Sequence, residues 1–144
     1  VLHTINPRLS PEHVAYIANH AEDKVIFVDL NLLPIVEGVF DRLETVKHVV
    51  VMTDRAHMPA ASRIPGLLCY EELIAGRPGT LAWPDFDERT AASLCYTSGT
   101  TGNPKGVLYS HRSTMIHSMM ASNGAVIPMD PDTTLLPVVP MFHA

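Results

Sequence analysis

Apolar positions at helical spacing mark the first element of the chain. In the stretch "LSPEHVAYIANHAED", the residues Val14, Ile17, Ala18 and Ala21 fall on one face of a helix. Ser10 is a candidate N-cap, and Pro11 suits the first helical position because its missing N–H would have no partner there. The pattern predicts a helix over residues 11–21.

Two short runs of β-branched and aromatic residues follow, "KVIFVD" at 24–29 and "HVVVM" at 48–52. Each is typical of a buried strand. The segment between them keeps helical spacing, with Asn31 as a candidate cap and Pro34 tolerable in the first turn. Its apolar positions are Leu32, Ile35, Val36, Val39, Phe40 and Leu43. A strand, a helix and a strand in this order predict an α/β fold with a mostly parallel sheet.

The second half of the chain alternates between broken and regular segments. Prolines and glycines interrupt residues 53–84, which we interpret as surface connection with one short helix at "YEELIAG". Strands are predicted at "AASLCYTS" and "GVLYS", and a last buried strand at "TLLPVVP". A helix capped by Ser110 or Ser113 is predicted after the second of these strands, and we expect its apolar face to pack in the core rather than to line a lipid tunnel. That face consists of Met115, Ile116, Met119 and Met120.

Composition excludes several classes of protein. A net charge of −5 over 144 residues, without any basic run, argues against nucleic-acid binding. Cys69 and Cys95 are far apart and have no metal-ligand spacing, so we expect reduced core residues. No apolar stretch approaches the roughly 20 residues of a membrane-spanning helix, which favours a soluble, cytoplasmic protein of one domain at most. The chain starts at Val1 and closes on an apolar run, and we expect both ends to be cut.

The richest chemistry lies in "TSGTTGNPKG", residues 97–106, between two predicted strands. Glycines allow positive φ and let successive N–H groups converge on an anion, while hydroxyls and a lysine add donors and charge. The stretch therefore predicts a cradle for a polyphosphate. The residues in question are Thr97, Ser98, Gly99, Thr100, Thr101, Gly102, Lys105 and Gly106.

Two other interpretations of this loop are weaker. A flexible linker uses the same residue types, but it needs neither a Pro-Lys-Gly ending nor strands at both ends. A Walker loop needs Gly before its lysine, Ser or Thr after it, and then a helix. Here Pro104 precedes Lys105, Gly106 follows it, and a strand comes next.

The stretch "YTSGTTGNPKGV" resembles the phosphate-binding signature of the adenylate-forming superfamily, which includes acyl-CoA synthetases, luciferases and nonribosomal adenylation domains. "PMFHA" is similar to a later motif of the family, and the resemblance implies that Phe142 and His143 lie beside the acyl-adenylate pocket. The opening segment "NPRLSPEHVAYIANHAEDKVIFVD" is similar to the medium- and long-chain fatty acyl-CoA synthetase branch.

The resemblance implies that residues 1–144 are an incomplete part of the large N-terminal AMP-binding domain. ATP would activate a carboxylic acid as acyl-adenylate, and coenzyme A would then take the acyl group as a thioester, a reaction of lipid metabolism. The loop would hold the β- and γ-phosphates, with Thr97 as a Mg²⁺ ligand. The catalytic lysine of the family would lie downstream. Two alternatives stay open: an adenylation domain that loads a carrier protein, and a truncated segment without activity.

Overall fold

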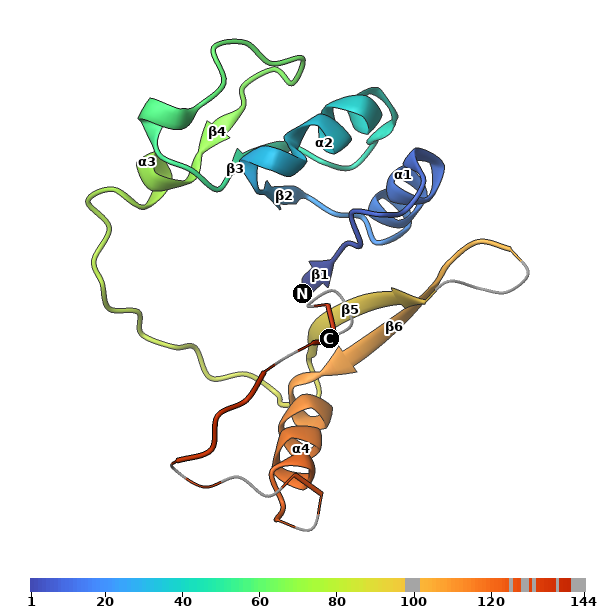
Figure 1. Cartoon of the computed structure of the whole chain (residues 1–144), viewed down its shortest axis with the longest axis vertical. Coiled ribbons are helices and arrows are strands. Elements are labelled where there is room, and N and C mark those ends of the chain that lie inside the picture. Colours follow the sequence, from blue (N-terminus) through green and yellow to red (C-terminus); the bar gives the residue numbers. More distant parts are fainter. Residues whose placement is uncertain (98–101, 125, 128–129, 131, 137, 141–144) are drawn as a thin grey trace. The chain divides into compact units, whose positions relative to one another are not determined.

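The computed structural model describes residues 1–97, 102–124, 126–127, 130, 132–136 and 138–140 (Figure 1). Its described residues form two compact units. The first contains those of Asn6–Trp83 and Gly99–Pro104, and the second those of Val1–Ile5, Pro84–Ser98 and Lys105–Ala144.

The first unit is built on a parallel sheet with strand order β2-β3-β4. Its regular elements are α1 (Pro11–His20), β2 (Val25–Val28), α2 (Leu33–Val39), β3 (His48–Val51), β4 (Leu68–Cys69) and α3 (Tyr70–Ile74), with single 3₁₀ turns at Leu30–Leu32, Phe40–Arg42 and Arg55–His57. The parallel pairing of β2 with β3, joined through α2, confirms the predicted strand–helix–strand unit.

The core of this unit forms around the central strand. Val49, Val50 and Val51 of β3 are almost fully buried, as expected for a strand covered on both faces. In contrast, β2 lies at the edge of the sheet, and its Val25 and Phe27 are exposed. The prediction of a buried strand is therefore right for β3 and only half right for β2.

Helix α1 confirms the prediction made from its apolar spacing, although it ends one residue earlier, at His20. The Ser10 side chain accepts a hydrogen bond from the His13 backbone N–H at 3.3 Å, which satisfies one of the free donors of the first turn. Val14, Ala15, Ile17 and Ala18 are buried on one face of the helix.

The segment before α2 departs from the expectation. Asn31 does not cap the helix but lies within the 3₁₀ turn Leu30–Leu32, and Leu33 rather than Leu32 is buried. Pro34 has no N–H to donate to residue 30, so an α-helical bond is impossible there. The chain instead closes tighter turns, in which the Leu32 N–H donates to the Asp29 carbonyl oxygen.

The second unit contains a mixed sheet with strand order β1-β5-β6. Its elements are β1 (Leu2–Thr4), β5 (Ala91–Thr97), β6 (Lys105–Ser110) and α4 (His111–Ala121). β1 pairs with β5 in parallel, while β5 and β6 form an antiparallel hairpin that leads into α4 (Figure 1). With one antiparallel pairing among otherwise parallel ones, the α/β class is confirmed.

Two expectations for the C-terminal third are wrong. The described residues of 134–140 form no strand, because none of the described strands pairs with their backbone. The apolar face of α4 is exposed rather than packed, with exposed fractions of 50% to 69% for Met115, Ile116, Met119 and Met120. A helix face becomes core only where a second layer covers it, and the described residues supply no such layer.

Cys69 and Cys95 are buried and form no disulfide, which confirms their interpretation as reduced core residues. Within the described ranges, no helix combines the length and the apolar character needed to cross a bilayer.

Candidate functional site

The candidate site is the loop end of the β5–β6 hairpin, where Thr97 and Lys105 form the last pair before the loop; we call this end the mouth of the hairpin. The register places Thr97 opposite Lys105 and Tyr96 opposite Gly106. Side chains of directly opposed residues lie on the same face of an antiparallel pair, so a hydroxyl and an ammonium group flank the loop together. The strand before the loop and the strand after it confirm the two predicted from the sequence.

A hydrogen bond joins the two sides of the mouth. The Thr97 hydroxyl donates to the Lys105 carbonyl oxygen at a distance of 3.5 Å, and both residues are exposed. In the part of the chain that the structure describes, no carboxylate forms an ion pair with Lys105. The charge of Lys105 is thus available to an anionic ligand at the loop.

Glycines at the mouth meet two different needs. Gly102 has φ +136°, a conformation that side-chain-bearing residues rarely adopt. Gly106 lies in a crowded position, since a Cβ atom there would lie 3.2 Å from Leu94 Cδ1 and 3.2 Å from Tyr96 Cζ. The Tyr96 ring therefore lies over the backbone of Gly106, a contact that sequence reasoning missed although an aromatic residue opposite a glycine is its usual sign.

Other predicted site residues lie outside the described residues. These are Ser98, Gly99, Thr100 and Thr101 in the loop, and Phe142 and His143 near the C-terminus. Their roles stay predictions. Of the predicted phosphate contacts, the structure places Thr97 and Lys105 together and Gly102 within the same loop.

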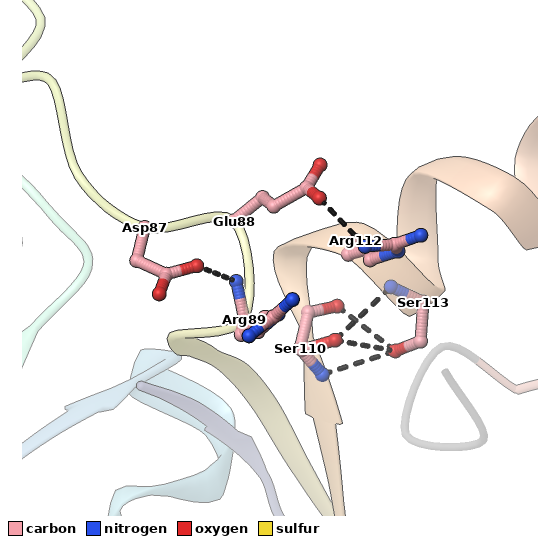
Figure 2. Close-up of polar contacts among 6 residues, drawn as sticks. All are labelled: Asp87, Glu88, Arg89, Ser110, Arg112 and Ser113. Atoms are coloured by element: carbon pink, nitrogen blue, oxygen red, sulfur yellow. Dashed lines mark hydrogen bonds and ion pairs between the residues drawn. The ribbon is translucent and has the colours of Figure 1, made fainter.

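The N-terminus of α4 is not free to bind a phosphate (Figure 2). The His111 and Arg112 backbone N–H groups donate to the carbonyl oxygens of Thr90 and Glu88, at 3.1 and 2.7 Å. The Ser113 N–H donates to the Ser110 side chain, and the two serines form a capping box. Because these donors are occupied, attraction of an anion to the hairpin rests on Lys105 and the loop, which agrees with the rejection of a Walker arrangement.

Three carboxyl groups have lowered pKa values, and all lie in local caps or turns. The pKa of Glu12 is lowered mainly by a hydrogen bond from its own backbone N–H, that of Asp54 mainly by the His57 side chain, and that of Asp130 mainly by the Thr133 hydroxyl. All three are exposed, and none belongs to the β5–β6 hairpin. They stabilise local turns and do not indicate a catalytic acid.

An α/β fold with a glycine- and hydroxyl-rich loop between two strands is accompanied by a family match over the whole chain. The family of AMP-binding enzymes matches this chain over residues 1–144, and the chain belongs to that family. Its resemblance to the adenylate-forming superfamily is thereby confirmed.

Among individual proteins, the chain is 56% identical over 143 residues to a 3-methylmercaptopropionyl-CoA ligase of Ruegeria pomeroyi. It is 52% identical over 143 residues to a medium-chain-fatty-acid–CoA ligase of Ectopseudomonas oleovorans. In both cases the match covers 99% of this chain and 26% of the relative. The chain thus spans about a quarter of the length of these curated relatives.

A solved structure agrees with these relatives. An anthranilate CoA ligase in complex with anthranoyl-AMP has a TM-score of 0.71 and 29% sequence identity, over 83% of this chain and 22% of that protein. The two sequence relatives and the solved structure named here are therefore CoA ligases, which are acid–thiol ligases.

Proposed function

We propose that this chain is an incomplete part of the N-terminal AMP-binding domain of an ATP-dependent acyl-CoA ligase. One observation carries the proposal: Thr97 and Lys105 are held opposite each other at the mouth of a glycine- and hydroxyl-rich loop. A hydroxyl and an ammonium group at one point suit the terminal phosphates of ATP, and a glycine-rich loop allows backbone N–H groups to face the same anion.

The reaction has two halves. A carboxylate oxygen of the acid attacks the α-phosphorus of ATP, the bond from this phosphorus to the β-phosphate oxygen breaks, and pyrophosphate leaves. The thiol of coenzyme A then attacks the acyl carbon, loses its proton, and releases AMP. Phosphoryl chemistry of this kind depends on position and on neutralised charge. Lys105 stabilises the negative charge that grows on the leaving pyrophosphate, and a charge pair about 4 Å apart is worth at most about 4 kcal/mol at an effective dielectric constant of 20.

Mg²⁺ accompanies ATP in this proposal, and Thr97 is its candidate ligand. A hydroxyl oxygen is the hard ligand type that Mg²⁺ prefers, and Thr97 is exposed at the mouth. Its hydrogen bond to Lys105 uses only the donor, so the oxygen lone pairs remain able to accept. When bound, Mg²⁺ would supply further neutralisation of the phosphates. Within the described residues, no cluster of three or more His, Cys, Asp or Glu side chains could hold a metal ion.

Coenzyme A is the proposed acceptor, because the relatives by sequence are CoA ligases. The acid is proposed to be an aliphatic carboxylic acid handled in lipid metabolism, with Phe142 and His143 beside the acyl-adenylate. We place the enzyme in the cytoplasm, where ATP and coenzyme A meet. A carrier-protein acceptor is the alternative, and it predicts acyl transfer to a phosphopantetheinylated carrier instead of free coenzyme A.

The test is acid-dependent exchange of pyrophosphate into ATP by the full-length enzyme that contains this chain. Removing one such charge-stabilising donor typically costs about 10² to 10³ in rate, so Lys105→Ala should lower exchange by about that much. Lys47→Ala is the matched control, since Lys47 is also an exposed lysine but lies outside the hairpin. Equal exchange by Lys105→Ala and the parent would show that the phosphate role is wrong.

A further inference from the structure

A turn ahead of β5 is bonded to the first turn of α4 (Figure 2). The Arg112 guanidinium pairs with the Glu88 carboxylate, with Nη1 and Oε1 3.0 Å apart. The Arg112 N–H also donates to the Glu88 carbonyl oxygen, so two contacts join the same two residues. The Phe86 and His111 rings lie next to them, with centroids 4.7 Å apart. We call the pair Glu88–Arg112 the hairpin clamp, because it closes the end of the β5–β6 hairpin opposite the loop.

The turn that presents Glu88 is itself ordered by hydrogen bonds. The Arg89 N–H donates to Asp87 Oδ1 at 2.9 Å (Figure 2), and the Thr90 N–H donates to the Asp87 carbonyl oxygen at 2.9 Å. Both backbone and side-chain bonds therefore fix the residue that meets Arg112. The clamp is not a chance meeting of two mobile side chains.

The position of Arg112 conflicts with the local preference of its helix. The first turn of α4 has no acidic residue, and a cation there opposes the positive end of the helix dipole. The Glu88 carboxylate, which reaches the same turn from outside the helix, offsets that charge. Arg112 is therefore unfavourable for α4 by itself, and its contact with Glu88 outside the helix explains its position.

Register is the property that such a clamp controls. A shift by one residue would move every side chain of β6 to the opposite face, and Lys105 with them. Burial specifies the register of β6 only weakly, because its residues from Lys105 to Tyr109 are all exposed and one of them is Gly106. An irregularity between Ala91 and Ser93, next to the clamp, also offsets the pairing.

Direct contact between Arg112 and a ligand at the loop is excluded by distance. Five residue steps separate Lys105 from Ser110, and a strand rises about 3.3 Å per step, so the end of β6 from which α4 starts lies roughly 17 Å from Lys105. Arg112 therefore acts on the mouth only through the hairpin.

We propose that Glu88 and Arg112 are positioning residues for ATP: their ion pair fixes the register and orientation of the hairpin that holds Thr97 opposite Lys105. This inference rests on the proposed function for its link to ATP. Its structural half, the control of the hairpin, can be tested without any reaction.

The kinetic test compares Glu88→Gln, Arg112→Gln and the charge-swapped double variant Glu88→Arg/Arg112→Glu in the full-length enzyme. Each single variant should raise the KM for ATP about two- to fivefold, the range that exposed ion pairs produce. The KM for the acid should stay at the parental value. The charge-swapped double variant should return the KM for ATP to the parental value. Arg42→Gln is the matched control, because it removes an exposed ion pair with Glu12 in the other unit.

Amide hydrogen exchange supplies a readout that needs no activity. Both single variants should speed hydrogen exchange of the β6 amides, Lys105–Ser110. The charge-swapped double variant should slow this hydrogen exchange again. The proposal is overturned if the single variants leave hydrogen exchange of the β6 amides unchanged, or if the charge-swapped double variant restores neither this hydrogen exchange nor the KM for ATP. It is also overturned if hydrogen exchange of β6 is faster while the KM for ATP stays parental. Absence of any acid-dependent pyrophosphate exchange in the parent would instead reject the proposed function. Hydrogen exchange of the β6 amides would still test whether the Glu88–Arg112 pair controls the hairpin.

Discussion

Replacing Gly106 by alanine tests the packing at the hairpin mouth. The new Cβ would lie 3.2 Å from Leu94 Cδ1 and from Tyr96 Cζ, closer than ordinary van der Waals contact. Overpacking of this kind costs about 1 to 3 kcal/mol, whereas replacing a strand glycine by alanine returns about 0.5 to 1 kcal/mol of backbone entropy. The leucine methyl and the tyrosine ring can each move by a few tenths of an ångström, so we expect a net loss of about 1 kcal/mol in the stability of the hairpin.

Hydrogen exchange of the β5 and β6 amides measures this loss directly. A change of about 1 kcal/mol corresponds to roughly fivefold faster opening, and the KM for ATP should rise with it because Lys105 is adjacent. Gly38→Ala in α2 is the matched control: a Cβ there meets no atom within 4 Å, so this variant should slow exchange in α2.

A double variant tests the cause of the loss. Valine lacks the δ carbon that crowds position 106, so Leu94→Val combined with Gly106→Ala should cost less than the sum of the two single variants. Exchange in Gly106→Ala as slow as in the parent, or an additive double variant, would refute the argument from crowding.

Further predictions concern α4, a surface turn and the isolated chain. Ser110→Ala should cost about 1 kcal/mol of α4 stability through loss of the N-cap, and Ser110→Gly only a few tenths, as measured by exchange of the α4 amides. The Asp54 carboxyl should titrate below its ordinary value of 3.8, because the His57 side chain hydrogen-bonds its charged form; its stabilising effect is present above 3.8 and lost as the pH falls through the lowered pKa. Carbon NMR of labelled aspartate measures this midpoint, and His57→Ala should return it toward 3.8, whereas a parental midpoint at or above 3.8 would contradict the assignment. The isolated 144-residue chain should form no acyl-CoA, since it spans about a quarter of its relatives, and a coupled assay that detects thioester would disprove this.

Local patterns predicted the elements that local forces create. Helix α1 has a good N-cap, a proline at its start and an apolar stripe, so its sequence alone selects the helix. The loop was predicted from residue types because hydroxyls, glycines and a lysine between strands have a distinct chemistry. The strands that flank it also followed from their own sequences.

Features that depend on distant partners were missed. Strand β4 has two residues and exists only because Leu68 and Cys69 pair with β3, and β1 likewise depends on β5. The register of the hairpin was equally hidden, since it involves the bulge near Ala91 and the contact between Glu88 and Arg112. Burial of the α4 face was predicted from its spacing, but burial requires a neighbour that spacing cannot supply.

The pairing of β1 with β5 sets an order of assembly during synthesis. Thr4 and Cys95 are neighbours in the sheet but 91 residues apart in the chain. At about 5 to 20 residues per second, β1 waits roughly 5 to 18 seconds on the ribosome for its partner. Strands β2, β3 and β4 are all complete before then, so the unit formed by Asn6–Trp83 can fold while β1 is still unpaired. The β5–β6 hairpin that carries Lys105 therefore completes its sheet with β1 last, after a whole unit of the chain has had time to fold.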